Sequence, residues 1–228
     1  MLQLVYSPQW FYGKDIIIDV ISIILLFLVS FASVRYYFMK RNKNCMYLAV
    51  SFVTIAVSFM FKIMTNFTLY NHEIKTHTLG LLTITYQTTE VTGALFHVGF
   101  LLHRILSLLG FYLLYSLYQK PNKTSHALAI FLLLVSAYFT ESAYYIFHLT
   151  LLLILVLIAI LYWPNIQRDN KSTILIAVSY ITIAVSQLLF ILVLVSTNFY
   201  VISEIVQLIG YAGLFSAFLM ATRHGKKK

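Results

Sequence analysis

Seven stretches of this chain are apolar, and each is close to the length that a helix needs to cross a membrane. Crossing about 30 Å of hydrocarbon requires roughly 20 helical residues. We therefore expect an all-α membrane protein, a single domain over residues 1–228 with seven transmembrane helices. The predicted spans are 16–37, 46–66, 96–117, 125–145, 146–163, 173–195 and 200–221.

The composition agrees with a chain made for lipid. Only 10% of the residues are charged and 61% are hydrophobic, whereas soluble domains have about 25% charged residues. The single cysteine, Cys45, excludes an internal disulfide. The sequence contains no GxxxxGK[ST], HExxH or GxSxG motif, so we expect neither an enzyme nor a bound cofactor.

The basic residues predict the orientation. Of the 16 Lys and Arg residues, 12 follow the first, third, fifth and seventh spans and so fall on one side. Positive residues collect on the cytoplasmic side, which predicts an outer N-terminus and a cytoplasmic C-terminus in the cell membrane. The net charge of +9 is thus explained by topology and does not indicate a nucleic-acid partner.

An internal repeat gives further organisation. Residues 49–58, AVSFVTIAVS, return as residues 177–186, AVSYITIAVS, at an offset of 128, and the match extends without a gap from the first predicted span to the fifth. The third and seventh spans match at an offset of 100, where Gly110 aligns with Gly210. Chance similarity between apolar helices is the alternative. If real, the plan is three helices, one linking helix and three helices, a parallel repeat.

This plan resembles the topology of the SWEET sugar transporters and the PQ-loop proteins, which implies solute transport. Those families carry prolines within their helices, whereas Pro8, Pro121 and Pro164 lie outside the predicted spans here, which counts against a transport hinge. Microbial rhodopsins have a similar seven-helix layout with a retinal-binding lysine in the last helix. Residues 200–221 contain no lysine, so a retinal Schiff base there is excluded.

Polar residues within the spans are the candidate functional residues, because a charge near the bilayer centre costs about 2.5–3.5 kcal/mol on insertion scales. All fall in the predicted outer halves of their helices: Asp19, Lys62, His97, His103, Arg104, His148, Glu204 and Gln207. The inner halves offer only small hydroxyl groups and amides. This asymmetry favours a site that is reached from outside.

Arg104 and Glu204 occupy matching positions in the aligned third and seventh spans, so opposite charges could pair between the halves. His97 and Gln207 share a helix face with them at spacings of seven and three. One interpretation is an outward-opening ligand pocket lined by His97, Arg104, Glu204 and Gln207, with Lys62 nearby. The other is a structural ion pair between two helices, with Lys62 and His148 at the headgroups.

The connection over residues 67–95 is predicted to be a long outer loop, and Leu81–Val91 favours a short strand or hairpin. A loop of this length could cover the pocket as a lid. His72, Glu73 and His77 could bind a metal, but a solvated loop is the simpler interpretation. His97 and His103 are six residues apart on divergent faces, which argues against a shared metal, and we expect no metal site.

Three functions fit these features. The first is a receptor- or sensor-like module that binds a small ligand from outside and signals through a separate membrane or cytoplasmic protein. The second is a small-solute transporter with a parallel repeat, which predicts a cavity at the midplane. The third is a structural subunit of a membrane complex. The polar outer halves and apolar inner halves favour the receptor.

Overall fold

The computed structural model describes residues 7–75, 89–119, 122–140, 143–166 and 171–224. Over these ranges the chain is helical and has no strands, so the all-α prediction is confirmed. The main helices are α1 (Lys14–Lys40), α2 (Lys43–Lys75), α3 (Thr89–Gln119), α4 (Lys123–Phe139), α5 (Tyr145–Ile166), α6 (Lys171–Ile191) and α7 (Asn198–His224). Two short 3₁₀ helices, η1 (Gln9–Phe11) and η2 (Leu192–Leu194), precede α1 and α7.

Six of these helices, all but α4, are long and apolar enough to cross a membrane, which indicates an integral membrane protein. The shorter α4 has 17 residues. Its start is fixed by the side chain of Asn122, which accepts a hydrogen bond from the Ser125 N–H at 2.9 Å. Helix α1 ends at Arg41, which adopts a left-handed conformation (φ 54°) and donates its N–H to the Tyr37 carbonyl.

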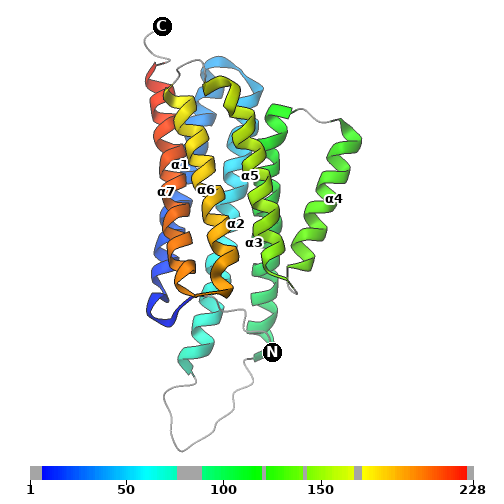
Figure 1. Ribbon diagram of the computed structural model, residues 1–228, viewed down its shortest axis with the longest axis vertical. Coiled ribbons are helices and arrows are strands. Elements are labelled where there is room, and N and C mark those ends of the chain that lie inside the picture. The colour runs from blue at the N-terminus through cyan, green and yellow to red at the C-terminus, as the bar shows by residue number, and fades with distance from the viewer. Residues whose placement is uncertain (1–6, 76–88, 120–121, 141–142, 167–170, 225–228) are drawn as a thin grey trace, which may run out of the picture.

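The helices form a bundle with two ends (Figure 1). The N-terminal end contains η1, the start of α1, the start of α5 and the start of α7. The C-terminal end contains the end of α1, the starts of α2, α4 and α6, and the end of α7. Exposed large apolar side chains, such as Phe31, Phe131 and Leu153, cover the outside of the bundle, as expected for a surface that faces lipid.

Two groups of three helices make up the bundle. In one group α2 packs against α1 and α3, and in the other α6 packs against α5 and α7. The groups meet where α1 contacts α7 and where α3 contacts α5. Helix α4 lies outside, against α3 and α5 (Figure 1), and buries Leu133, Ser136 and Ala137.

The C-terminal half of the bundle is packed with apolar side chains. Ile55, Leu108, Leu114, Ile183 and Leu214 are each 1% exposed or less. Two glycines bring helix backbones close together there. A Cβ at Gly110 would lie 3.2 Å from the Ser51 carbonyl oxygen and would overlap Ile55, and a Cβ at Gly210 would lie 3.2 Å from the Ser179 carbonyl oxygen and would overlap Ile183.

The connection between α2 and α3 differs from the prediction. Helix α2 continues to Lys75 and α3 begins at Thr89, so both ends of the predicted loop 67–95 are helical. Hydropathy marks where a span leaves the hydrocarbon, but polar residues continue a helix beyond that point. The predicted strand over 81–91 is therefore wrong for its last three residues, which begin α3, and its other residues, like His77, lie outside the described ranges.

Candidate functional site

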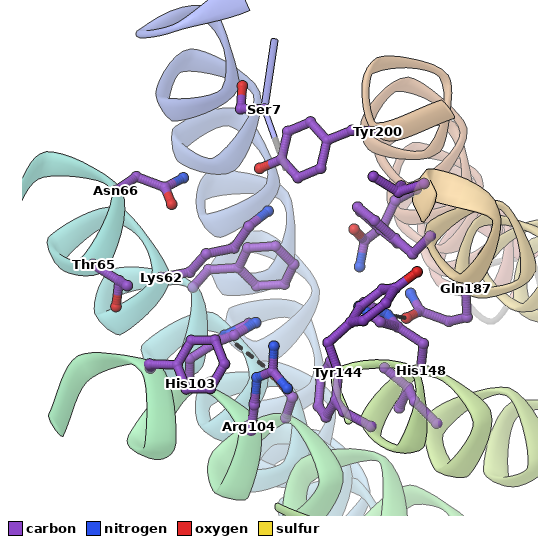
Figure 2. A pocket seen from close by; sticks show the side chains of 18 of the residues that line it. Ser7, Lys62, Thr65, Asn66, His103, Arg104, Tyr144, His148, Gln187 and Tyr200 are labelled. Atoms are coloured by element: carbon purple, nitrogen blue, oxygen red, sulfur yellow. Dashed lines mark hydrogen bonds between the residues drawn. The ribbon is translucent and has the colours of Figure 1, made fainter. Parts of the chain in front are cut away.

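A cavity of about 130 Å³ lies between the two groups of helices (Figure 2). Its wall comes from α2, α3, α5, α6 and α7, with Ser7, Tyr144 and Val193 from the connecting segments. Toward the N-terminal end the wall includes the half-buried Asn66 and Tyr200. Its deepest residues along the helices, Phe111 and Tyr211, are both 1% exposed. Between Tyr200 and Tyr211 the wall follows α7 for about 16 Å.

Aromatic rings form much of this wall. They come from both groups of helices: Phe59, Phe96, Phe100, Phe111, Tyr144, Phe147, Phe190, Tyr200 and Tyr211. The polar lining residues include two cations, Lys62 and Arg104, and three amides, Asn66, Gln187 and Gln207. Figure 2 shows the Lys62 and Arg104 side chains extending from α2 and α3 toward the wall that carries Tyr144 and His148. The cavity therefore combines apolar surface with a few fixed polar groups, as ligand sites do.

Arg104 is buried in this wall and lies among aromatic rings. The residue is 6% exposed. The carbon of its guanidinium group is 3.7 Å from the centre of the Phe100 ring and 5.1 Å from the centre of the Phe147 ring. Cation–π attraction of this kind is worth about 2 kcal/mol when the cation is desolvated. The two rings come from α3 and α5, so Arg104 lies where the two groups of helices meet.

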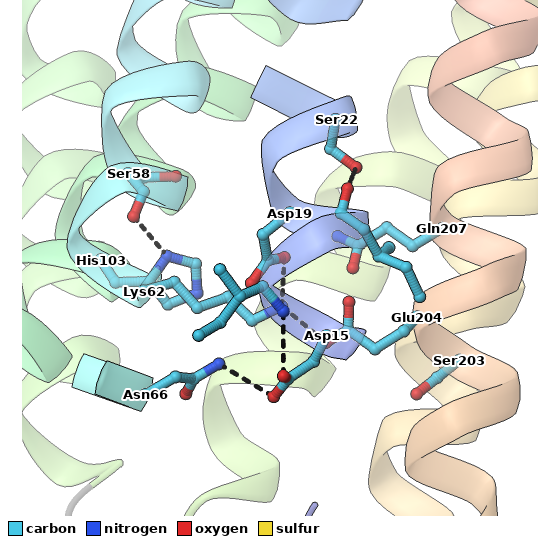
Figure 3. Close-up of polar contacts among 12 residues, drawn as sticks. Asp15, Asp19, Ser22, Ser58, Lys62, Asn66, His103, Ser203, Glu204 and Gln207 are labelled. Atoms are coloured by element: carbon cyan, nitrogen blue, oxygen red, sulfur yellow. Dashed lines mark hydrogen bonds and ion pairs between the residues drawn. The ribbon is translucent and has the colours of Figure 1, made fainter. Parts of the chain in front are cut away.

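Lys62 has a different environment, in which it bridges two buried carboxylates. Its Nζ atom lies 2.8 Å from Asp19 Oδ1 and 2.6 Å from Glu204 Oε1 (Figure 3). The side chains of Asp19 and Glu204 are 0% and 1% exposed, and that of Lys62 is 14% exposed. We call these three residues the Lys62 cluster. It joins α1, α2 and α7, and its two carboxylates do not line the cavity.

Helical spacing explains how the Lys62 cluster forms. Asp15 and Asp19 are four residues apart and share a face of α1, and Lys62 and Asn66 share a face of α2 in the same way. Asn66 Nδ2 donates a hydrogen bond to Asp15 Oδ2 at 3.2 Å. Two polar contacts, one turn apart, therefore hold α1 against α2.

The Lys62 cluster also includes a residue of α7, where the same periodicity gives Glu204 and Gln207 different contacts. Glu204 points to Lys62, whereas Gln207, one turn further, lines the cavity and donates from Nε2 to the Tyr211 hydroxyl at 3.2 Å.

Two histidines also belong to the polar part of the wall. His103 donates from Nδ1 to the Ser58 carbonyl at 2.9 Å, and His148 donates from Nδ1 to Gln187 Oε1 at 2.8 Å. The His148 ring is also stacked on Phe190, with ring centres 4.9 Å apart. Within the described ranges, no group of three or more His, Cys, Asp or Glu residues could hold a metal ion.

The structure separates the residues that the sequence placed in one pocket. Lys62, Arg104 and Gln207 line the cavity. His97 does not line it, and this exposed residue of α3 packs its ring against Phe96. His97 lies about two turns nearer the start of α3 than Arg104, and at that level Phe96 and Phe100 line the cavity instead.

Glu204 also differs from the prediction, because it pairs with Lys62 and not with Arg104. Sequence reasoning underestimated Asp19, Gln187 and His148. The signal for Asp19 was its position one turn from Asp15 in an otherwise apolar stretch, since a buried carboxylate needs a cation and Lys62 is the only one in α2 between Cys45 and Phe67. No comparable spacing pointed to Gln187.

Comparison with known proteins finds no match to any protein-family model, to any curated protein or to any solved structure.

Proposed function

We propose that this protein is a seven-span membrane module that binds a small ligand from the outer side and passes the signal to a separate membrane or cytoplasmic partner. The observation that carries the proposal is the cavity. Residues of both helix groups line it, it holds Arg104 and Lys62 in an aromatic wall, and it extends inward from the N-terminal end. A ligand seated there contacts both groups and can change how they pack against each other.

The N-terminal end is the outer end in this proposal. Exposed basic side chains gather at the C-terminal end of the bundle: Arg35, Arg41, Lys43, Lys123 and Lys171. This distribution supports a cytoplasmic C-terminal end. Helix α4 counts as the seventh span because it runs from the end of α3 back to the start of α5, at the opposite end of the bundle (Figure 1). At 17 residues it is about 26 Å long, slightly less than the hydrocarbon thickness.

The two helix groups are related by a parallel repeat in this proposal. The contact of Gly110 with Ser51 and Ile55 has a counterpart in the contact of Gly210 with Ser179 and Ile183. Corresponding residues are separated by the same offsets as in the sequence repeat: 100 between the two glycines, and 128 between the two serines and between the two isoleucines. The repeat pairs α1 with α5 and α3 with α7. The contact of α1 with α7 therefore has its counterpart in the contact of α5 with α3. These equivalences support a common origin for the two groups.

The packing of the C-terminal half favours a receptor over a transporter. Beyond Phe111 and Tyr211 the interior contains fully buried apolar side chains, among them Leu114 and Leu214. A transporter must wet both ends of its path in turn, and close contacts at Gly110 and Gly210 resist such opening. The cavity between two repeated groups is the observation that favours the transporter, and the same experiment decides between the two.

Cysteine accessibility tests the proposal. Replacing the single native cysteine (Cys45→Ser) gives a background without thiols, in which Thr65→Cys and Gln207→Cys place a thiol in the cavity wall. A membrane-impermeant thiol reagent applied to the outer face should label both. Ala217→Cys, at a fully buried position near the other end of α7, is the matched control and should stay unlabelled.

The same variants in inverted vesicles separate the two functions. Labelling from the outer face only supports the receptor. Labelling of Thr65→Cys from both faces favours the transporter, and labelling from neither face contradicts an outward-facing site.

A further inference from the structure

We infer that the Lys62 cluster is a binding site for one exchangeable proton, which adds to Oδ2 of Asp19. The inference goes beyond the proposed function and holds whether or not the cavity binds a ligand, because it depends on contacts within the cluster.

The Lys62 cluster has more negative than positive groups. Two carboxylates, those of Asp19 and Glu204, share one ammonium group, with contacts of 2.8 and 2.6 Å (Figure 3). Among the described residues, Lys62 is the only cation that forms an ion pair with either of them. With all three groups ionised, the cluster carries a formal charge of one negative. An uncompensated charge in a buried site is strongly unfavourable, and a carboxyl group relieves it by binding a proton.

The other groups near Asp19 do not offset this charge. Helix α1 packs mainly against α2 and α7. The titratable groups of these helices and of α1 itself that lie close enough to interact electrostatically with Asp19 are Lys62, Glu204, Tyr211 and Asp15. Tyr211 is neutral while it keeps its proton, and Asp15 adds a negative charge when ionised. The ammonium of Lys62 is therefore left to balance more than one carboxylate.

The oxygen that receives the proton is identified by its contacts. Asp19 is 0% exposed, and its Oδ1 atom accepts a hydrogen bond from Lys62 Nζ. Its Oδ2 atom is also buried, and no described residue donates a hydrogen bond to it. A buried carboxylate oxygen in this state has lost its hydration without compensation. A proton from solvent that adds to Oδ2 removes the charge, and Oδ1 can still accept from Lys62, so uptake of the proton breaks no contact of the cluster.

A proton fits this site better than a metal ion. A cation such as Ca²⁺ takes about six to eight oxygen ligands, and within the described ranges no group of three or more His, Cys, Asp or Glu residues could hold a metal ion. A proton needs one oxygen only. It can reach the cluster through the cavity, because Lys62 belongs to both the cluster and the cavity wall.

The position of the site gives the proton an effect on the whole bundle. Asp19 lies on α1, in one helix group, and Glu204 lies on α7, in the other. When both are ionised they repel each other across the contact between the groups, and a proton on Asp19 ends this repulsion. We therefore expect α1 and α7 to pack more tightly in the protonated protein, so that pH acts on the packing of the two groups.

Infrared difference spectroscopy of the purified protein in lipid nanodiscs, recorded against pH, tests the inference. Ordinary carboxyl groups titrate at about pH 4, so above about pH 6 the C=O band of a protonated carboxylic acid marks an unusual site. We expect such a band, which is lost as the pH is raised further. Asp19→Asn should remove it. Glu204→Gln leaves Asp19 and Lys62 as a neutral pair, so in this variant the band should be lost at a pH about 1–3 units lower.

Glu73→Gln is the matched control. The chain has only seven acidic residues, and Glu73 lies on α2 about three turns beyond Lys62, so this change should leave the band as it is. A second control replaces choline chloride by sodium chloride at constant pH and ionic strength, and the band should again stay unchanged.

The spectrum of the unchanged protein does not depend on how any variant folds, and the absence of the band above about pH 6 overturns the inference. A band that survives in a folded Asp19→Asn protein overturns the assignment to Asp19. A band that Glu204→Gln leaves at the same pH shows that the shared ammonium is not its cause. Loss of the band in sodium chloride means that the site takes a metal cation instead of a proton. None of these measurements uses a ligand of the cavity or thiol labelling, so their failure leaves the proposed function standing.

Discussion

Lys62 and Glu204 form the closest contact between charged groups in the described part of the protein, with Nζ and Oε1 2.6 Å apart. The two residues are 142 positions apart in the sequence and belong to different helix groups, one to α2 and the other to α7. The same ammonium contacts Asp19 of α1. The Lys62 side chain thus links three helices where α1 meets α7. Among the described residues, no equivalent cluster of charges lies where α3 meets α5. There, Arg104 contacts aromatic rings.

Lys62→Met should destabilise the protein by about 3–5 kcal/mol, because two buried carboxylates would lose the cation between them. The free energy of unfolding can be measured by titration with a denaturing detergent. The triple variant Asp19→Asn, Lys62→Met, Glu204→Gln should recover most of the loss, since it leaves no charge in the Lys62 cluster.

Lys14→Met is the control for this change. Lys14 is exposed at the start of α1 and lies 5.3 Å from the centre of the Trp10 ring, so its loss should cost less than about 1 kcal/mol. A Lys62→Met protein as stable as the Lys14→Met protein would show that the Lys62 cluster does not hold the helices together.

The helices were predictable because about 20 consecutive apolar residues admit few other structures. Each predicted span overlaps a helix, and six of these helices are long and apolar enough to cross a membrane. The pairing of charges was harder to predict. Hydropathy gives the depth of Arg104 and Glu204 in the membrane but not the direction in which each side chain points. Their equal depth suggested that they pair. The direction of Glu204 depends on how α7 is rotated against α1. Asp19, on α1, lies close enough to share Lys62 with Glu204.

Gly110→Ala and Gly210→Ala should each destabilise the protein by about 1–3 kcal/mol, and by similar amounts. An added methyl group would collide with Ile55 in one case and with Ile183 in the other, and would crowd the carbonyl of Ser51 or Ser179. Denaturing-detergent titration measures both effects. Ser116→Ala, on the same helix as Gly110, should change stability by no more than about 0.5 kcal/mol, because Ser116 is half-buried and bonds only to its own helix. Clearly unequal effects of the two glycine changes would count against the repeat.

Labelling of single cysteines tests the seven-span topology. In the Cys45→Ser background, Thr197→Cys and Tyr145→Cys place exposed thiols at the N-terminal end, and Thr124→Cys places one at the start of α4. An impermeant maleimide added to intact cells should label the first two, and should label Thr124→Cys only after permeabilisation. Labelling of Thr124→Cys and Tyr145→Cys from the same side would mean that α4 does not cross the membrane.

The changes Arg104→Ala and Glu204→Ala should have additive effects on stability, within about 0.5 kcal/mol, because the contacts of Arg104 with Phe100 and Phe147 share no partner with the contact of Glu204 with Lys62. The double variant should be less stable than either single variant by the sum of their effects. A double-mutant cycle of Lys62→Met and Glu204→Gln should instead give an interaction energy larger than about 1 kcal/mol, since these two residues are in direct contact. A double variant of Arg104 and Glu204 that regains stability over the single variants would make the two residues a structural ion pair.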